Sequence, residues 1–248
     1  PAVTWEGNVA HSAFDSELPL PPYAARFTET VMRDFASHGD RVAVLDGISG
    51  EARTFDDLSR DVEGVARGLS GLGVGAGDTV GLFTPNHVDF FAAFHGAAKL
   101  GATVTPLNPL YTSHEIAQQL QGSRAKCLVA HSACFDTART ACADLPLMER
   151  LVQMDGERPL EGADATLHAL KRTEGADLPA TPVASDATAC LPYSSGTTGL
   201  PKGTMLTHDN LVVNLLQCDY VDGRFWEAGK DVIISPLPFF HIYGFMYS

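Results

Sequence analysis

The sequence predicts an α/β fold in which layered, largely parallel sheets are covered by flanking helices. Short runs rich in β-branched residues alternate along the chain with longer runs of helical periodicity, and turn-forming residues separate the two kinds. Such alternation is typical of α/β domains, because a helix connects each parallel strand to the next. The chain has 248 residues, of which 45% are hydrophobic, so it can bury a large core.

Strands are expected where β-rich runs are bounded by turn formers. Five such runs lie at 41–46, 78–84, 102–107, 125–130 and 231–237. Another strand is expected to begin within "TACLPYSS" at 188–195 and to lead directly into a polar, glycine-rich stretch.

Helices are expected between these strands. Apolar residues recur at steps of four and three from Leu58 to Leu72, which predicts an amphipathic helix, and Thr54 is a suitable N-cap. The glycine run "GLGVGAG" (71–77) lacks the spacing of a dinucleotide-binding loop, and we interpret it as the end of this helix and a turn. Further helices are expected at 87–100, 113–122, 134–144 and 207–218, the last with Thr207 as its N-cap.

The stretch 156–187 suggests a division of the chain. It is rich in Gly, Pro, Ala and charged residues and shows little periodicity, which favours surface segments and a linker. We therefore expect a boundary near residue 185. Residues 1–185 would form a first α/β subdomain, and residues 186–248 would begin a second one that carries the glycine-rich stretch.

The charge of the chain limits its partners. With 30 acidic and 17 basic residues the net charge is −13, which disfavours nucleic acid and anionic lipid as general partners. The most apolar run, 88–104, is interrupted by charged residues, so no membrane span is expected. The N-terminus shows no secretory signal and lacks an initiator Met, which suggests a trimmed chain.

The five cysteines are an odd number scattered through a large chain, as expected for reduced thiols, and we expect a cytoplasmic protein. Cys127, His131 and Cys134 could supply three ligands to zinc. Cys127 lies in an apolar run and no fourth ligand stands at the usual spacing, so we interpret these cysteines as buried thiols.

The stretch "YSSGTTGLPKG" (193–203) combines four Ser or Thr hydroxyls, three glycines and Lys202. Glycines let backbone N–H groups approach an anion closely, hydroxyls add donors, and lysine adds positive charge, so the stretch predicts a nucleotide phosphate loop. It is not a Walker loop, because Pro201 stands where the second glycine is required, and it is not a hydrolase nucleophile elbow. The alternative is a polar Gly/Ser/Thr linker.

Four stretches in order resemble a known superfamily. The stretch "LPYSSGTTGLPKGTMLTHDNLVVN" (191–214) resembles the AMP-binding signature of adenylate-forming enzymes, and 54–86 resembles their first helix–strand unit. The segment 101–130 is similar to the branch of 4-coumarate:CoA ligase and acyl-CoA synthetases, and "PLPFFHIYGF" (236–245) resembles the downstream histidine motif. The resemblance covers about residues 25–248.

The resemblance implies a ligase that uses ATP, Mg²⁺ and coenzyme A. A carboxylic acid, either aryl or medium-chain acyl, would become an acyl-adenylate with release of pyrophosphate, and the thiol of coenzyme A would then displace AMP. Lys202 and His241 would act in catalysis, and Thr198 would lie nearest the magnesium ion. His241, Tyr243 and Gly244 would border the acyl pocket. The residues that would hold the β- and γ-phosphates are Ser194, Ser195, Gly196, Thr197, Thr198, Gly199 and Lys202.

Members of this superfamily continue well beyond the histidine motif. The resemblance therefore implies an incomplete N-terminal domain without the C-terminal domain, and we expect residues 1–248 alone neither to adenylate nor to form a thioester. The alternatives are a non-catalytic fragment or interaction module, or another adenylating enzyme such as a luciferase-like or peptide-synthetase domain.

Overall fold

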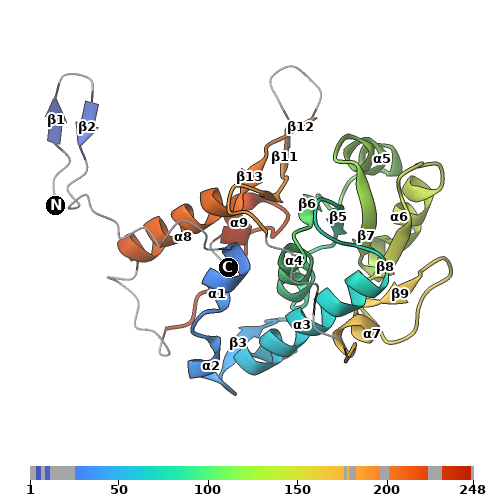
Figure 1. Ribbon diagram of the computed structural model, residues 1–248, viewed down its shortest axis with the longest axis horizontal. Helices are drawn as coiled ribbons and strands as arrows, with labels where there is room; N and C mark the ends of the chain where they lie inside the picture. Colours follow the sequence, from blue (N-terminus) through green and yellow to red (C-terminus); the bar gives the residue numbers. More distant parts are fainter. Residues whose placement is uncertain are drawn as a thin grey trace.

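A seven-stranded sheet forms the centre of the molecule (Figure 1). The computed structural model describes residues 4–6, 9–11, 26–175, 178, 183–195, 201–222 and 231–246. In spatial order the strands are β13, β10, β6, β5, β7, β8 and β9. Neighbouring strands are parallel except β10 and β13, which are antiparallel. The bounds are β5 Thr79–Phe83, β6 Thr103–Leu107, β7 Ala125–Ala130, β8 Arg150–Gln153, β9 Ala165–Thr166, β10 Thr188–Cys190 and β13 Leu206–Thr207.

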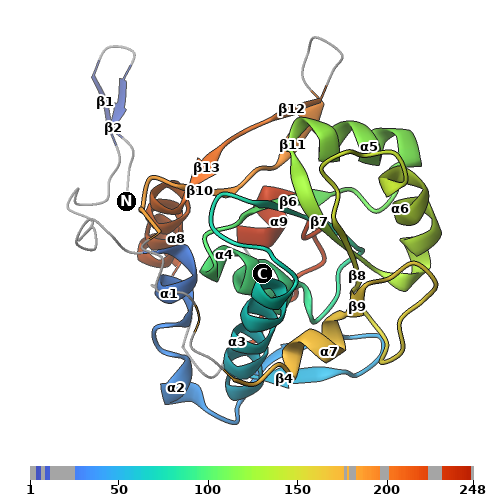
Figure 2. The ribbon, with the colours of Figure 1, turned by 45° about the vertical axis from the view of Figure 1, so that its right-hand side comes forward.

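Helices cover both faces of the sheet (Figures 1 and 2). The apolar core on one face joins the sheet to α3, α4, α7 and α8, and the core on the other face joins it to α5 and α6. Strand β5 lies between the two cores and all five of its residues are buried. The helices of the described residues are α1 Phe27–Met32, α2 Phe35–His38, α3 Phe55–Gly71, α4 Phe90–Lys99, α5 Ser113–Gly122, η1 Ser132–Cys134, α6 Phe135–Cys142, α7 Leu167–Lys171, α8 His208–Asp222 and α9 Ile242–Met246.

Within the described parts of the chain, three two-stranded pairs lie outside this sheet. They are β1 (Thr4–Glu6) with β2 (Val9–His11), β3 (Val42–Leu45) with β4 (Ala52–Thr54), and β11 (Tyr193–Ser195) with β12 (Pro201–Gly203). The last pair carries the predicted phosphate loop.

Local signals explain the long helices. Helix α3 begins with a capping box, in which the Thr54 hydroxyl accepts from the Asp57 N–H and the Asp57 carboxylate accepts from the Thr54 N–H. It ends at the predicted glycine run, where Gly73 and Gly77 have φ values of 88° and 84°. Helix α8 begins after Thr207, whose hydroxyl accepts from the Asn210 N–H as the predicted N-cap.

Two predictions about secondary structure are wrong. Residues 231–237 form no strand, because they pair with none of the described strands; Val232 is 88% exposed and Ile234 is 86% exposed. The stretch 156–187 is more than surface segments and a linker, since it contains β9 and α7, and Leu167 and Leu170 of α7 are buried. The four other β-rich runs are confirmed as β3, β5, β6 and β7.

The division near residue 185 stays a prediction. Strands β10 and β13, which follow residue 185, join the same sheet as β5 to β9. None of the helices in the described ranges is both long enough and apolar enough to cross a membrane.

Candidate functional site

The predicted phosphate loop is carried by a β-hairpin that the sequence did not indicate. Strands β11 and β12 are antiparallel, and Ser194 lies opposite Lys202, with both side chains exposed. Cross-strand neighbours have Cβ atoms about 5 Å apart, so a hydroxyl and an ammonium lie together at the base of the loop. Ser195 pairs with Pro201. The remaining predicted loop residues, Gly196, Thr197, Thr198 and Gly199, lie outside the described residues, as does the side chain of Ser195.

The hairpin is anchored to the sheet at its base. The Leu191 N–H donates to the Val104 carbonyl at 2.8 Å, and the Thr105 hydroxyl donates to the Leu191 carbonyl at 2.8 Å. The Tyr193 ring lies so close to Gly203 that a Cβ there would come 2.9 Å from its Cε2 atom. Burial raises the pKa of Tyr193. The two strands of the hairpin, β11 and β12 in Figure 2, are therefore fixed to the sheet at their base.

The histidine motif forms a tight turn followed by α9. The His241 N–H donates to the Pro238 carbonyl at 3.1 Å, and the Phe245 N–H donates to the His241 carbonyl at 3.0 Å. Gly244 is buried against this turn, and a Cβ at Gly244 would lie 2.3 Å from the Pro238 oxygen. Only glycine fits at this position, which accounts for its place in the motif.

The His241 ring is exposed and has a defined tautomer. The Tyr243 N–H donates to His241 Nδ1 at 3.3 Å, so the ring proton of neutral His241 lies on Nε2. The Nε2–H group is then available to a carboxylate. Tyr243 is 55% exposed, and its assignment to the acyl pocket stays a prediction.

Asn86 holds the histidine motif against the sheet, and no sequence pattern indicated a role for it. Its side-chain amide donates to the Leu237 carbonyl at 2.8 Å and accepts from the Phe239 N–H at 2.8 Å. Asn86 follows β5 and precedes α4, so it stands at the carboxyl end of a central parallel strand. Its position after a predicted central strand could have indicated a role in the site, because ligands of parallel sheets bind at the carboxyl ends of the strands.

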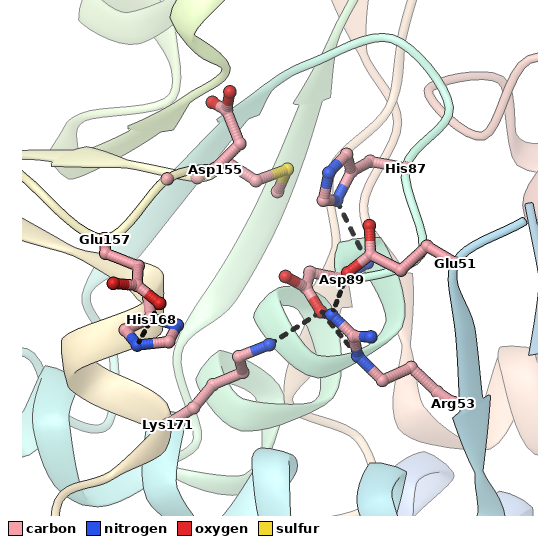
Figure 3. A pocket seen from close by; sticks show the side chains of 10 residues that line it. Glu51, Arg53, His87, Asp89, Asp155, Glu157, His168 and Lys171 are labelled. Atoms are coloured by element: carbon pink, nitrogen blue, oxygen red, sulfur yellow. Dashed lines mark hydrogen bonds and ion pairs between the residues drawn. The ribbon is translucent and has the colours of Figure 1, made fainter. Parts of the chain in front are cut away.

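A second polar region is a pocket of about 160 Å³ that none of the predicted site residues lines (Figure 3). Arg53, Asp61, Asp89 and Lys171 form what we call the buried ion cluster. Asp89 Oδ1 accepts from Arg53 Nη2 at 3.0 Å and from Lys171 Nζ at 2.9 Å, and Lys171 Nζ also lies 3.3 Å from Asp61 Oδ2.

The charges of the buried ion cluster compensate one another. Burial raises the pKa of Asp61, and the charge of Lys171 opposes that rise. Burial alone would lower the pKa of Arg53, but pairing with Asp89 and Glu51 outweighs it and raises the pKa. Because both cations are already paired with carboxylates, the cluster is suited to joining β4, α3, α4 and α7 rather than to holding a phosphate.

The comparisons with known proteins agree with the architecture. The profile described as AMP-binding enzyme matches residues 31–248. A 4-coumarate–CoA ligase 1 of Petroselinum crispum is 37% identical over 239 residues, covering 93% of this chain and 42% of that protein. A 4-coumarate–CoA ligase 5 of Oryza sativa subsp. japonica is 40% identical over 239 residues, covering 94% of this chain and 41% of that protein. The chain thus spans about two-fifths of the length of these curated relatives.

Solved structures show the same fold. A long-chain-fatty-acid–CoA ligase of Archaeoglobus fulgidus superposes with a TM-score of 0.79 at 26% identity, covering 94% of this chain and 46% of that one. An anthranilate–CoA ligase in complex with anthranoyl-AMP superposes with a TM-score of 0.72 at 28% identity, covering 80% of this chain and 38% of that one.

Proposed function

Because the chain belongs to the AMP-binding enzyme family, we propose that it is the N-terminal portion of an ATP-dependent acyl- or aryl-CoA ligase. The observation that carries the proposal is the hairpin that sets Ser194 opposite Lys202 at the base of the Gly/Ser/Thr loop. The names of the relatives favour an aromatic acid as the substrate, since they include 4-coumarate and anthranilate ligases.

The proposed reaction has two steps. A carboxylate oxygen attacks the α-phosphorus of ATP, the bond to the bridging oxygen breaks, and pyrophosphate leaves. The thiol of coenzyme A then loses its proton to solvent and its sulfur attacks the acyl carbon. The bond between that carbon and the phosphate oxygen breaks, and AMP leaves. Lys202 and the loop hydroxyls stabilise the charge that develops on the departing pyrophosphate, and His241 Nε2–H orients the carboxylate.

Mg²⁺ would neutralise phosphate charge in the first step. The hydroxyl oxygen of Thr198 is a ligand type that suits this hard cation, but Thr198 lies outside the described residues. Its role therefore rests on the resemblance alone.

The test replaces Lys202 and Thr198 by alanine, singly and together. A hydrogen bond to a charged group contributes about 1.5–3 kcal/mol, so we expect Lys202→Ala to weaken MgATP binding by about 10- to 100-fold. Calorimetric titration of MgATP measures this, with Arg158→Ala as the control because Arg158 is an exposed cation after β8. Unchanged binding in Lys202→Ala would favour a non-catalytic interaction module instead.

We further propose that residues 1–248 alone neither adenylate nor form a thioester. The chain spans about two-fifths of its curated relatives, so positioning groups would come from the rest of such a protein. Carboxylate-dependent exchange of radiolabelled pyrophosphate into ATP, catalysed by these residues alone, would contradict the proposal.

A further inference from the structure

We infer that Asn86 is a positioning residue, which fixes the backbone of residues 237–239 and thereby holds His241 in the substrate site. The inference rests on the proposed function for the role of His241, and on the geometry of this chain for everything else. Asn86 and its two partners are separated by 151 and 153 residues in the sequence.

The contact matches the chemistry of an amide side chain. Asn carries one carbonyl acceptor and one NH₂ donor, and Asn86 uses the first on the Phe239 N–H and the second on the Leu237 carbonyl, each at 2.8 Å. Two bonds from one planar group fix both the position and the direction of the backbone between Leu237 and Phe239. An ionised carboxylate of the same shape can accept from Phe239 but cannot donate to Leu237.

The support beneath Asn86 is rigid. Asn86 follows β5, whose residues are all buried, and Val88, two residues after Asn86, is only 5% exposed. The Phe90 ring at the start of α4 packs on the Phe239 ring, with centroids 5.6 Å apart. The two hydrogen bonds that Asn86 makes with Leu237 and Phe239, which we call the Asn86 clamp, therefore connect the histidine motif to the centre of the sheet.

The far side of His241 is held separately. The Phe245 ring in α9 packs against Phe94 with a centroid distance of 4.3 Å, and against Phe90 at 5.9 Å. His241 lies between this aromatic anchor and the Asn86 clamp, and its N–H donates to the Pro238 carbonyl inside the clamped segment. A change at Asn86 therefore displaces a backbone segment that only Phe240 separates from His241.

The alternative is that the aromatic contacts alone hold the motif. The two explanations differ for Asn86→Asp, which is nearly isosteric. A packing role tolerates this change, whereas the clamp loses its donor and places a negative oxygen against the Leu237 carbonyl.

The experiment compares wild type with Asn86→Ala, Asn86→Asp and the control Asn108→Ala. Asn108 follows the neighbouring strand β6, and within the described residues its side-chain oxygen accepts from the Leu110 N–H of its own turn. The readouts are the NMR signal of the His241 ring, assigned by its loss in His241→Gln, and amide hydrogen exchange over residues 237–246. Neither readout requires catalytic activity.

We expect both Asn86 variants to shift the His241 signal and to speed exchange of the Phe239 amide by about 3- to 10-fold, as for the loss of one hydrogen bond. Thermal unfolding should stay close to wild type, because Asn86 is exposed, and Asn108→Ala should leave the His241 signal unchanged. A wild-type signal and wild-type exchange in Asn86→Asp would overturn the inference.

Activity adds a second criterion in the protein that carries the remaining length of the family. We expect kcat for carboxylate-dependent ATP–pyrophosphate exchange to fall by about 10-fold in Asn86→Ala, with KM for MgATP within about twofold. A wild-type kcat would overturn the inference while the proposed function stands. If wild type itself shows no exchange, the proposed function fails, and the His241 signal alone decides whether Asn86 positions that ring.

Discussion

Asp89 is the residue on which the buried ion cluster depends. Its side chain is 8% exposed and one of its oxygens bonds both Arg53 and Lys171. Asp89→Asn removes the charge but keeps the size, which leaves two cations in a partly buried site with less compensation. Breaking a buried pair in this way typically costs about 3–5 kcal/mol, and we expect a loss near that range in the free energy of unfolding, measured with urea.

The matched control is Asp136→Asn. Asp136 also pairs with an arginine, Arg139, but its side chain is 91% exposed. A surface ion pair is screened by water, so this change should leave the unfolding midpoint where it is. If Asp89→Asn lowers the free energy of unfolding no more than the control does, water screens the buried ion cluster and its ion pairs do not stabilise the packing of the helices.

The packing of α3 against α7 depends on glycines of α3, and the contact is tightest at Gly64. A Cβ at Gly64 would lie 2.0 Å from the Lys171 carbonyl oxygen, whereas a Cβ at Gly71, at the end of the same helix, would meet nothing within 4 Å. We expect Gly64→Ala to lower the free energy of unfolding by at least about 1–3 kcal/mol through overpacking. Gly71→Ala should be neutral or stabilising, since alanine favours helix. Equal stability of the two variants, measured by urea unfolding, would show that α7 can move away without cost.

The helices and strands that the sequence predicted are those with strong local signals. Helix α3 has a long apolar stripe and a capping box, and β5 and β7 are dense apolar runs, so their propensities and their tertiary contacts agree. Helix α7 has five residues and β9 has two, which is too short for any periodicity to show. The run 231–237 has strand composition, but a strand also needs a partner.

The candidate site shows the same limit. The sequence composition predicted a phosphate loop, yet it could not indicate that Tyr193–Ser195 and Pro201–Gly203 would pair as a hairpin. Glycine and proline are depleted in strands, so the intrinsic strand propensity of this stretch argued against a hairpin. The role of Asn86 depends on contacts more than 150 residues away, which no local pattern encodes.

Two buried histidines connect parts of the chain that are far apart in sequence. His95 of α4 lies 1% exposed beneath α1, where its Nδ1 is 3.0 Å from the Thr28 hydroxyl and its ring stacks on Phe27. His208 of α8 is also 1% exposed, and its Nδ1 accepts from the Phe27 N–H at 3.2 Å. Helix α1 is thus held on α4 and α8 by two imidazoles, which burial keeps neutral.

This arrangement predicts a loss of stability in mild acid. Burial lowers the pKa of His95 to about 3, with a smaller contribution from the charge of His208. Burial also lowers the pKa of His208, although Glu29 beside it opposes the change and Arg26 adds to it. Both histidines have lower pKa values in the folded state than in the unfolded chain. Below about pH 6.5 the unfolded state therefore binds more protons. His95 then costs about 1.4 kcal/mol of folding free energy per pH unit, and His208 acts in the same direction.

We expect the free energy of unfolding, measured with urea, to fall between pH 7.5 and pH 5.5. We expect His95→Gln to reduce that fall by about 1.4 kcal/mol because glutamine does not titrate. The carboxylates of Asp46, Asp57 and Glu115 do not confuse the result. Their pKa values are lowered by hydrogen bonds from backbone N–H groups, so they are ionised throughout this range. The contrary result is an equal fall in the free energy of unfolding of wild type and His95→Gln between pH 7.5 and pH 5.5. His95 would then have the same pKa in the folded and unfolded states, as expected if α1 separates from α4 and exposes the ring before the protein unfolds. Hydrogen exchange of residues 27–32 at pH 5.5 would then show α1 open while β5 stays protected.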